Sequence, residues 1–131
     1  MYVEFEVSDQ IPASPEEIYS AWLDSTGHSK MTGSPAIVSR LVGERFEAWD
    51  GYIQGENLEL ESKVRIVQSW RTTDFDEKDE DSVLEILLKA HENGTLVTIR
   101  HSHLPKYGMQ YLQGWIDYYF TPMKEYFNKK R

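Results

Sequence analysis

Residues 109–130 read MQYLQGWIDYYFTPMKEYFNKK. Apolar side chains recur in this stretch at steps of three and four residues, which is the pattern of one buried helix face. The spacing predicts one long helix from about Met109 to Lys130, kinked at Pro122, whose ring does not fit a regular helix. The apolar side chains form a stripe along this helix, which comprises Leu112, Trp115, Ile116, Tyr119, Met123 and Phe127, widened by Tyr111 and Tyr118. The rest of the chain must supply an apolar surface against which this stripe packs.

A hairpin between Val83 and Leu104 supplies the clearest part of that surface. Asn93 and Gly94 are a strong signal for a type I′ turn. A two-residue loop at this point pairs Glu92 with Thr95. It also predicts these opposed pairs on one face: Ala90 with Val97, Leu88 with Ile99, Ile86 with His101 and Leu84 with His103. The face is apolar apart from the two histidines, so the turn and the hydrophobic pattern indicate the same register.

The N-terminal segment predicts one strand and two short helices. Residues 3–7 alternate between apolar and polar side chains, as a strand with one buried face does. Ser14 and Glu17 form a capping-box pattern around Pro15, which suits the first position of a helix. A second short helix is expected from Ser25 to about Met31.

The middle of the chain predicts a second hairpin. Asp50 and Gly51 favour another type I′ turn. The turn pairs Trp49 with Tyr52, and the residues expected on one face are Phe46, Ala48, Ile53 and Gly55. A glycine inside a strand indicates a bulge or a close approach by another element. A longer connection around Asn57 to Lys63 is expected to precede a strand whose shared face carries Val64, Ile66, Gln68 and Trp70.

This order of elements is a segregated α+β pattern. We expect a single domain, residues 1–131, in which a curved antiparallel sheet of about six to seven strands wraps around the long C-terminal helix. The one sharp change in composition is the stretch from Asp74 to Asp81, which holds six carboxylates and one lysine. An acidic docking loop or a cation site is one interpretation, and a solvated loop held open by its charges is the simpler one.

Composition excludes several classes of function. The net charge of −8 argues against nucleic-acid binding, which needs a basic surface. The absence of cysteine excludes disulfides and cysteine-ligated metal centres. The N-terminus lacks a signal-peptide pattern, and the chain has no apolar run near the ~20 residues of a membrane span. A cytoplasmic protein is therefore expected.

Two stretches of the sequence resemble the sequences of a known family. They are residues 46–71, with FEAWDGYIQG and RIVQSWR, and residues 113–120, QGWIDYYF. Both are similar to the C-terminal domain of the activator of heat shock protein 90 ATPase homologue family. That family lies within the helix-grip (SRPBCC) superfamily of START-like and Bet v 1-like domains. The resemblance implies a helix-grip fold over the whole chain, often with a hydrophobic ligand cavity. It also implies a stress-response role as a module that modulates the chaperone's ATPase.

The aromatic residues suggest where a ligand would bind. Trp49 and other aromatic side chains converge from the sheet and the long helix, either as plain core or as the lining of a pocket with a few polar groups. We expect a small hydrophobic or amphipathic ligand and no cofactor. The candidate ligand-binding residues are Trp22, Met31, Phe46, Ile53, Trp70, Ile86, Ile99, His101, His103, Trp115, Tyr118 and Tyr119.

His101 and His103 are the only candidates for chemistry. Two residues apart on a strand, they fit a metal site or an acid–base pair in a cavity enzyme of the cyclase or hydrolase type. The simpler interpretation is a hydrogen-bonded core histidine. Metal sites need a third ligand, and no carboxylate shares this face, although His28 would complete a set if the fold brought it near. The chain carries no nucleophile elbow, phosphate loop or zinc-helix motif, so enzymatic activity is not favoured and no metal is expected.

Three arginines are expected on the outer face of the sheet: Arg65, Arg71 and Arg100. They would serve to dock an acidic partner. Cross-strand pairing with Glu56, Glu59 or Glu85 is the simpler account, and such surface pairs contribute little to stability.

Overall fold

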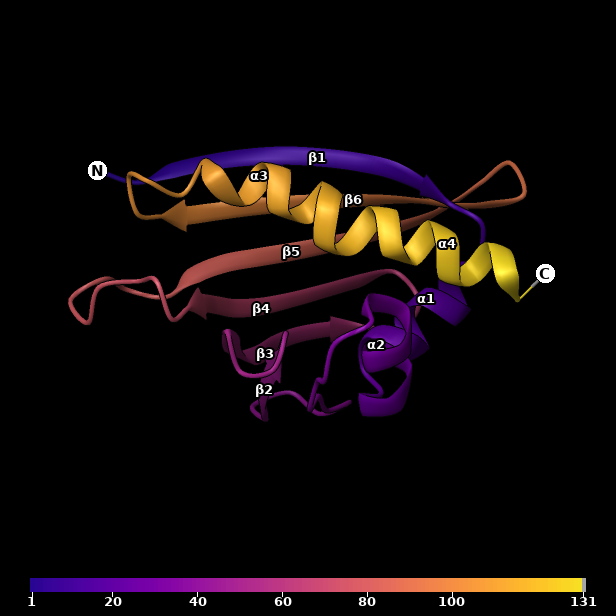
Figure 1. Cartoon of the computed structure of the whole chain (residues 1–131), viewed down its shortest axis with the longest axis horizontal. Helices are drawn as coiled ribbons and strands as arrows, with labels where there is room; N and C mark the ends of the chain where they lie inside the picture. The colour runs from indigo at the N-terminus through magenta and orange to yellow at the C-terminus, as the bar shows by residue number, and fades with distance from the viewer. Residues whose placement is uncertain (131) are drawn as a thin grey trace.

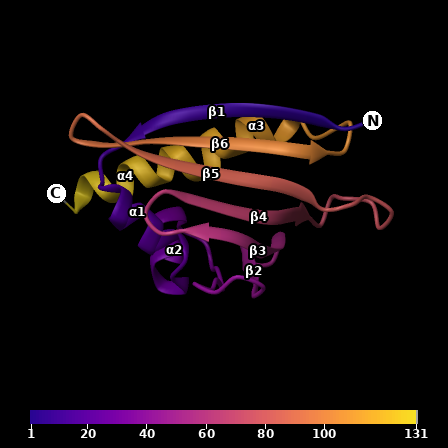
Figure 2. The same ribbon diagram turned by 180° about the vertical axis from the view of Figure 1, so that it is seen from behind.

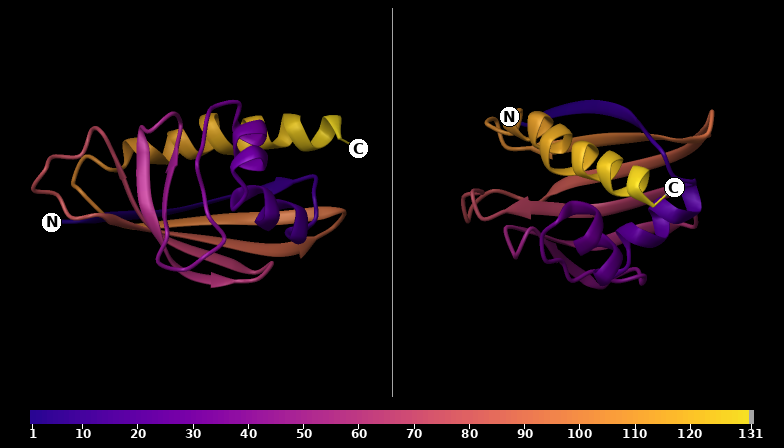
Figure 3. Two further views of the ribbon diagram at one scale, coloured as in Figure 1. Left: turned by 90° about the horizontal axis from the view of Figure 1, so that it is seen from below. Right: turned by 45° about the vertical axis from the view of Figure 1, so that its right-hand side comes forward.

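The computed structural model describes residues 1–130 and shows a six-stranded antiparallel sheet with the order β1-β6-β5-β4-β3-β2. The C-terminal helix lies across one face of this sheet, and the left-hand view of Figure 3 shows the sheet curving beneath it. The α+β helix-grip fold is thereby confirmed. The strands are β1 (Val3–Ile11), β2 (Arg45–Ala48), β3 (Ile53–Glu61), β4 (Arg65–Thr72), β5 (Ser82–His91) and β6 (Gly94–Leu104).

Two short helices follow β1 and lie at one end of the sheet, beside the C-terminal part of the long helix (Figures 1 and 2). They are α1 (Pro15–Trp22) and α2 (Ser25–Thr32). The capping box is confirmed, because Ser14 Oγ accepts from the Glu17 amide and the Glu17 side chain accepts from the Ser14 amide. Their buried side chains, among them Trp22 and Met31, extend the core at this end of the fold.

The long C-terminal helix is confirmed, but its irregularity differs from a simple kink. It consists of α3 (Gln110–Trp115), a π-helical turn η1 (Ile116–Phe120) and α4 (Thr121–Lys129). Pro122 has no N–H to donate to Tyr118, and the helix widens by one residue just before it. The extra residue brings Phe120 into the core beside Tyr119, whereas Tyr118 is 57% exposed.

The register of the β5–β6 hairpin differs from the prediction by two residues. Ile86 lies opposite Ile99, and His91 pairs with Gly94, so the turn is centred on Glu92 and Asn93. The predicted turn was wrong because Gly94 is needed inside β6, where a Cβ would collide with the Ile11 carbonyl of β1. A shift of two keeps the side chains on their faces, so the apolar face was correctly predicted.

Strand β3 is longer than predicted. The expected connection from Asn57 to Lys63 is wrong, because β3 continues to Glu61. A bulge after Asn57 breaks the alternation of the sequence, and the Asn57 side chain turns inward to accept a hydrogen bond from Gln68 at 2.9 Å. Val64 consequently precedes β4 and is 47% exposed, instead of sharing the buried face.

The first hairpin turn is confirmed. Asp50 and Gly51 have φ of 57° and 88°, as a type I′ turn requires, and Ala48 pairs with Ile53. Gly55 lies where a Cβ would overlap the backbone of Ser69 and the ring of Phe46. The predicted close approach at this glycine is therefore confirmed.

Gly55→Ala is expected to lower the free energy of unfolding by about 1–3 kcal/mol, because the added methyl overpacks this site. Gly114→Ala is the matched control, since a Cβ there meets only Tyr118 Cδ2 at 3.9 Å. The control should leave stability unchanged or raise it by up to about 1 kcal/mol. Urea unfolding of both variants tests this, and equal stabilities would contradict the close approach at Gly55.

The acidic stretch between β4 and β5 is more ordered than an open solvated loop. Arg71 donates to the Asp79 carbonyl at 3.1 Å and to the Asp81 carboxylate at 2.8 Å, while Phe75 is buried. Tyr107 donates to Asp79 at 2.6 Å, and this bond holds the pKa of the Asp79 carboxyl below its ordinary value. Within residues 1–130, no three histidine or carboxylate groups are placed to hold a metal ion.

Arg65 and Arg100 form cross-strand ion pairs, as the simpler interpretation predicted, whereas Arg71 bonds to the acidic stretch and to none of the three predicted glutamates. Arg65 contacts Glu59 at 2.9 Å and Glu85 at 2.5 Å, and Arg100 lies 3.7 Å from Glu85. Arg100 also pairs with Glu6 at 2.7 Å. Among residues 1–130, no helix has the length and apolar character to cross a membrane.

Candidate functional site

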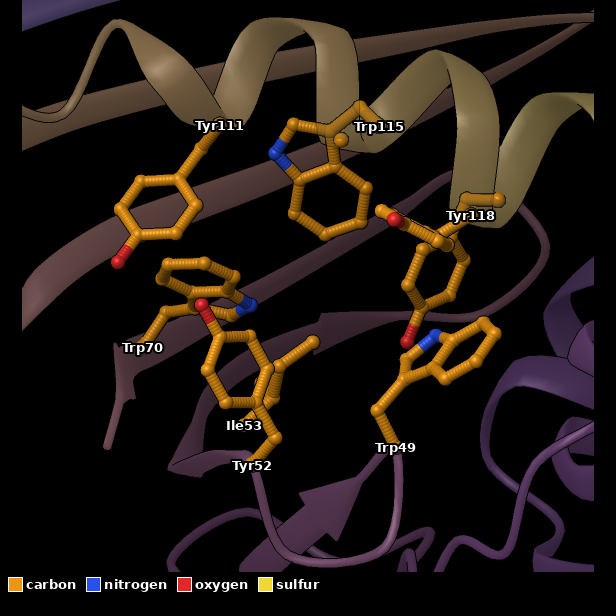
Figure 4. Close-up of a pocket in the computed structure, with 9 residues that line it drawn as sticks. Trp49, Tyr52, Ile53, Trp70, Tyr111, Trp115 and Tyr118 are labelled. Atoms are coloured by element: carbon orange, nitrogen blue, oxygen red, sulfur yellow. The ribbon is translucent and has the colours of Figure 1, made fainter. Parts of the chain in front are cut away.

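A cavity of about 300 Å³ lies between the long helix and the β3–β4 end of the sheet. Figure 4 shows that aromatic side chains from both layers turn toward it. The lining residues come from the first hairpin turn, from β3 and β4, and from α3 and η1: Trp49, Tyr52, Ile53, Trp70, Tyr111, Gly114, Trp115, Tyr118 and Tyr119.

The cavity has a buried floor and an exposed mouth. Trp70 and Trp115 are each 3% exposed, whereas Tyr118 is 57% and Tyr52 is 37% exposed. Trp49 meets Tyr118 edge to face, with ring centroids 5.3 Å apart. The space is therefore apolar, flat-walled and accessible from one side, which suits a small planar molecule.

His101 holds the two tryptophans of the cavity floor in place through hydrogen bonds. Trp115 Nε1 donates to His101 Nδ1 at 3.0 Å, so the ring proton is on Nε2, which donates to Ser82 Oγ at 2.9 Å. Ser82 Oγ in turn donates to the Trp70 carbonyl at 2.6 Å. Burial lowers the pKa of His101 to about 3, so the ring is neutral. This network links both floor tryptophans to β5 and β6.

His28 fixes Tyr119 in a similar way. Its Nδ1 lies 2.9 Å from the Trp22 carbonyl and must donate, so its Nε2 accepts from the Tyr119 hydroxyl at 2.8 Å. Burial lowers the pKa of His28 to about 4 and raises the pKa of Tyr119. Both buried histidines therefore act as neutral hydrogen-bonding groups.

Two further tyrosines of the lining have partners for their hydroxyl groups. Tyr111 lies 2.7 Å from Thr72 Oγ1, and Tyr52 donates to Asp74 at 2.6 Å. Burial raises the pKa of Tyr111 and, together with the bond to Asp74, that of Tyr52. Trp49 differs: its Nε1 is the one buried side-chain nitrogen or oxygen in residues 1–130 that lacks a hydrogen-bond partner.

The structure divides the candidate ligand-binding residues into three groups. The cavity is lined by Ile53, Trp70, Trp115, Tyr118 and Tyr119. Six others are buried on α1, α2 and the sheet and do not line this cavity: Trp22, Met31, Phe46, Ile86, Ile99 and His101. His103 forms the third group, because it lies outside both.

His103 does not share the inner face with His101. Between the pairs of Val3 with Leu104 and Phe5 with His101, β6 carries one extra residue, and His103 adopts φ 56°. Its ring stacks on Tyr2 at 3.7 Å and faces outward, where the imidazole meets Glu80 at 2.9 Å. Because His101 is sealed and His103 is outside, the two do not form a metal site or an acid–base pair.

Four lining residues were missing from the list of candidate ligand-binding residues: Trp49, which was named only among the converging aromatic side chains, and Tyr52, Tyr111 and Gly114. Tyr111, Gly114 and Tyr118 recur at helical spacing, so the periodicity already placed them on one side of the helix. Tyr52 follows a turn whose backbone sets its direction, and the sequence carries no comparable signal for it.

Comparison with known proteins identifies relatives over most of the chain. Residues 12–128 match the model of the family described as Activator of Hsp90 ATPase homolog 1-like protein. The Homo sapiens activator of 90 kDa heat shock protein ATPase homolog 1 is 29% identical over 115 residues, which are 87% of this chain and 34% of that protein. This chain thus spans about a third of that relative's length.

Solved structures agree with this assignment. An HSP90 activator from Plasmodium falciparum is 26% identical, with a TM-score of 0.76 over 90% of each chain. Protein MLL2253 from Mesorhizobium loti has the same fold, with a TM-score of 0.82, 20% identity and coverage of 98% of this chain and 99% of that one. Since the family model covers nearly all of the helix-grip domain described above, the chain belongs to the Activator of Hsp90 ATPase homolog 1-like protein family.

Proposed function

We propose that this protein is a binding domain that holds a small, planar, apolar molecule between the sheet and the C-terminal helix. The observation that supports this function is the cavity of about 300 Å³ walled by aromatic faces. This volume is at the lower end of the ~300–1,000 Å³ of known ligand pockets. An aromatic guest would contact Trp49, Trp70 and Trp115 by stacking or edge contacts, which add to the gain from removing apolar surface from water.

Gly114 supports the same function from the side of the helix. A glycine in a helix interior costs about 1 kcal/mol relative to alanine. A Cβ at Gly114 would meet only Tyr118 Cδ2, at 3.9 Å, so packing alone does not require a glycine here. The absence of a side chain at this position instead enlarges the cavity.

Gly114→Leu is expected to fill the cavity and to weaken binding of fluorene at least tenfold. The native protein should bind fluorene with a Kd on the order of 10 µM, a reasonable affinity for an apolar ligand of this size. Quenching of tryptophan fluorescence measures both affinities. Gln113→Leu is the matched control, because it adds the same side chain at an exposed position of α3.

The control should bind fluorene like the native protein. Two results would overturn the proposed function: native protein that does not bind fluorene or similar planar hydrocarbons, or Gly114→Leu protein that binds fluorene as well as the native protein does. Circular dichroism and urea unfolding of each variant separate a filled cavity from an unfolded chain.

A second candidate function is regulation of a ninety-kilodalton heat-shock chaperone. It is favoured by the 26% identity to the Plasmodium falciparum HSP90 activator over 90% of both chains. Adding this protein to such a chaperone is then expected to raise its rate of ATP turnover in a saturable manner. An unchanged rate at saturating concentration would remove this candidate and leave the ligand-binding function untouched.

A further inference from the structure

The indole N–H of Trp49 is left without a partner at the edge of the cavity. Its Nε1 is buried and lacks an acceptor, which is an unfavourable state for a buried donor. Trp49 also has φ 52°, an unfavourable backbone conformation for a bulky side chain. Both costs occur at the residue that begins the turn beside the cavity mouth.

Most of the other polar groups of the lining already have hydrogen-bond partners. The indole N–H of Trp115 is bound to His101, and the hydroxyl groups of Tyr119 and Tyr52 are bound to His28 and Asp74. Trp70 Nε1 also makes no hydrogen bond but is not fully buried, and Tyr118 lies at the exposed mouth of the cavity. Trp49 Nε1 is therefore the lining donor whose missing partner carries a penalty, and a guest with one acceptor would remove that penalty by a hydrogen bond to Trp49.

The charge around the cavity restricts the acceptor to a neutral group. No lysine, arginine or histidine is among the lining residues, and the nearby Asp74 carries a carboxylate. A buried anion without a cationic partner is strongly unfavourable, and the chain's net charge of −8 adds to the repulsion. A carbonyl oxygen meets the requirement, whereas a carboxylate does not.

Tyr118 covers the Trp49 edge in the structure. Its ring stands at 70° to the indole, and Figure 4 shows the two side chains meeting at one side of the cavity. Because Tyr118 is 57% exposed, it can rotate further into solvent with little loss of buried area. A guest then reaches the indole N–H without disturbing the floor.

We infer that the ligand of this cavity is a neutral aromatic carbonyl compound, whose ring lies against Trp70 and Trp115 and whose carbonyl oxygen accepts a hydrogen bond from Trp49 Nε1. This inference rests on the proposed function and names the ligand class for the same site. It makes Trp49 the residue that sets specificity.

The test compares fluorene, 9-fluorenone and fluorenone-4-carboxylate, which share one planar skeleton. The native protein is expected to bind 9-fluorenone about tenfold more tightly than fluorene, although fluorenone is the more polar molecule, and to bind the carboxylate most weakly. In Trp49→Phe, which keeps an aromatic ring but lacks the N–H, the smaller ring should weaken the binding of fluorene and fluorenone alike, and the ratio of the two affinities should fall from about ten to about one.

The outcomes separate the two proposals. If none of the three compounds binds, the proposed function itself fails. If fluorene and fluorenone bind equally to the native protein, or if Trp49→Phe keeps the preference, the cavity is a binding site but the carbonyl inference is overturned. Tight binding of the carboxylate would overturn it as well.

Discussion

Replacing His101 with alanine is expected to lower the free energy of unfolding by about 3–4 kcal/mol. The side chain is fully buried, and its loss leaves a void beside Trp70 and Trp115. It also leaves the Trp115 indole N–H without its acceptor, which costs about 1–3 kcal/mol by itself. Urea unfolding followed by tryptophan fluorescence measures the change.

His103 provides the matched comparison for this prediction. It lies on the outside of the same strand, so His103→Asn should change the free energy of unfolding by less than about 1 kcal/mol. Asparagine is the suitable replacement because it tolerates the left-handed backbone at φ 56°. Equal effects at the two positions would contradict the different roles that the structure gives them.

Stability is expected to fall steeply between pH 7 and pH 5. Burial holds the pKa of His28 at about 4 and that of His101 at about 3, both below the ordinary value of 6.5. As the pH falls, the unfolded chain therefore takes up protons before the folded one. The stability conferred by the neutral rings is fully present above pH 6.5, and each ring loses about 1.4 kcal/mol per pH unit below it.

Urea unfolding at pH 7, 6 and 5 tests this directly. The range lies above the pH at which ordinary carboxyl groups titrate, so the histidines dominate the change. The two rings together predict a slope of up to about 2.7 kcal/mol per pH unit near pH 5. A free energy of unfolding that is constant across this range would show that neither ring is held neutral in the folded state, and half the expected slope would show that only one of them is.

The elements of the fold were predictable because several local signals agreed. The capping box at Ser14 and the type I′ turn at Asp50 are short-range patterns, and the structure realises both. The stripe on the long helix depends only on spacing. These features are set by a few neighbouring residues, which is why one sequence suffices to find them.

The errors arose where tertiary contacts overrode a local pattern. Gly94 resembles a turn residue, but it lies within β6 because Ile11 of β1 approaches too closely for any side chain. A bulge turns His103 outward, although simple alternation places it inside. In both cases the deciding neighbour is about 80 residues or more away in the sequence, in the first strand.

The candidate site was only partly predictable for a related reason. Alternation and helical spacing separate inward from outward residues, but they do not say which inward residues meet a space. Trp22 and Trp70 are both buried, yet only Trp70 borders the cavity, whereas Trp22 stacks on Trp115 and Tyr119. Packing in three dimensions, and not the period of the pattern, decides where the cavity lies.

The most direct test of the central claim is a ¹H–¹⁵N spectrum of the tryptophan indole groups with and without fluorene. The chain has 4 tryptophans, of which Trp49, Trp70 and Trp115 line the cavity and Trp22 does not. Saturating fluorene is predicted to shift the signals of the three lining tryptophans most. Shifts confined to exposed apolar residues such as Leu41 and Val42, with those three signals unmoved, would contradict binding inside the cavity.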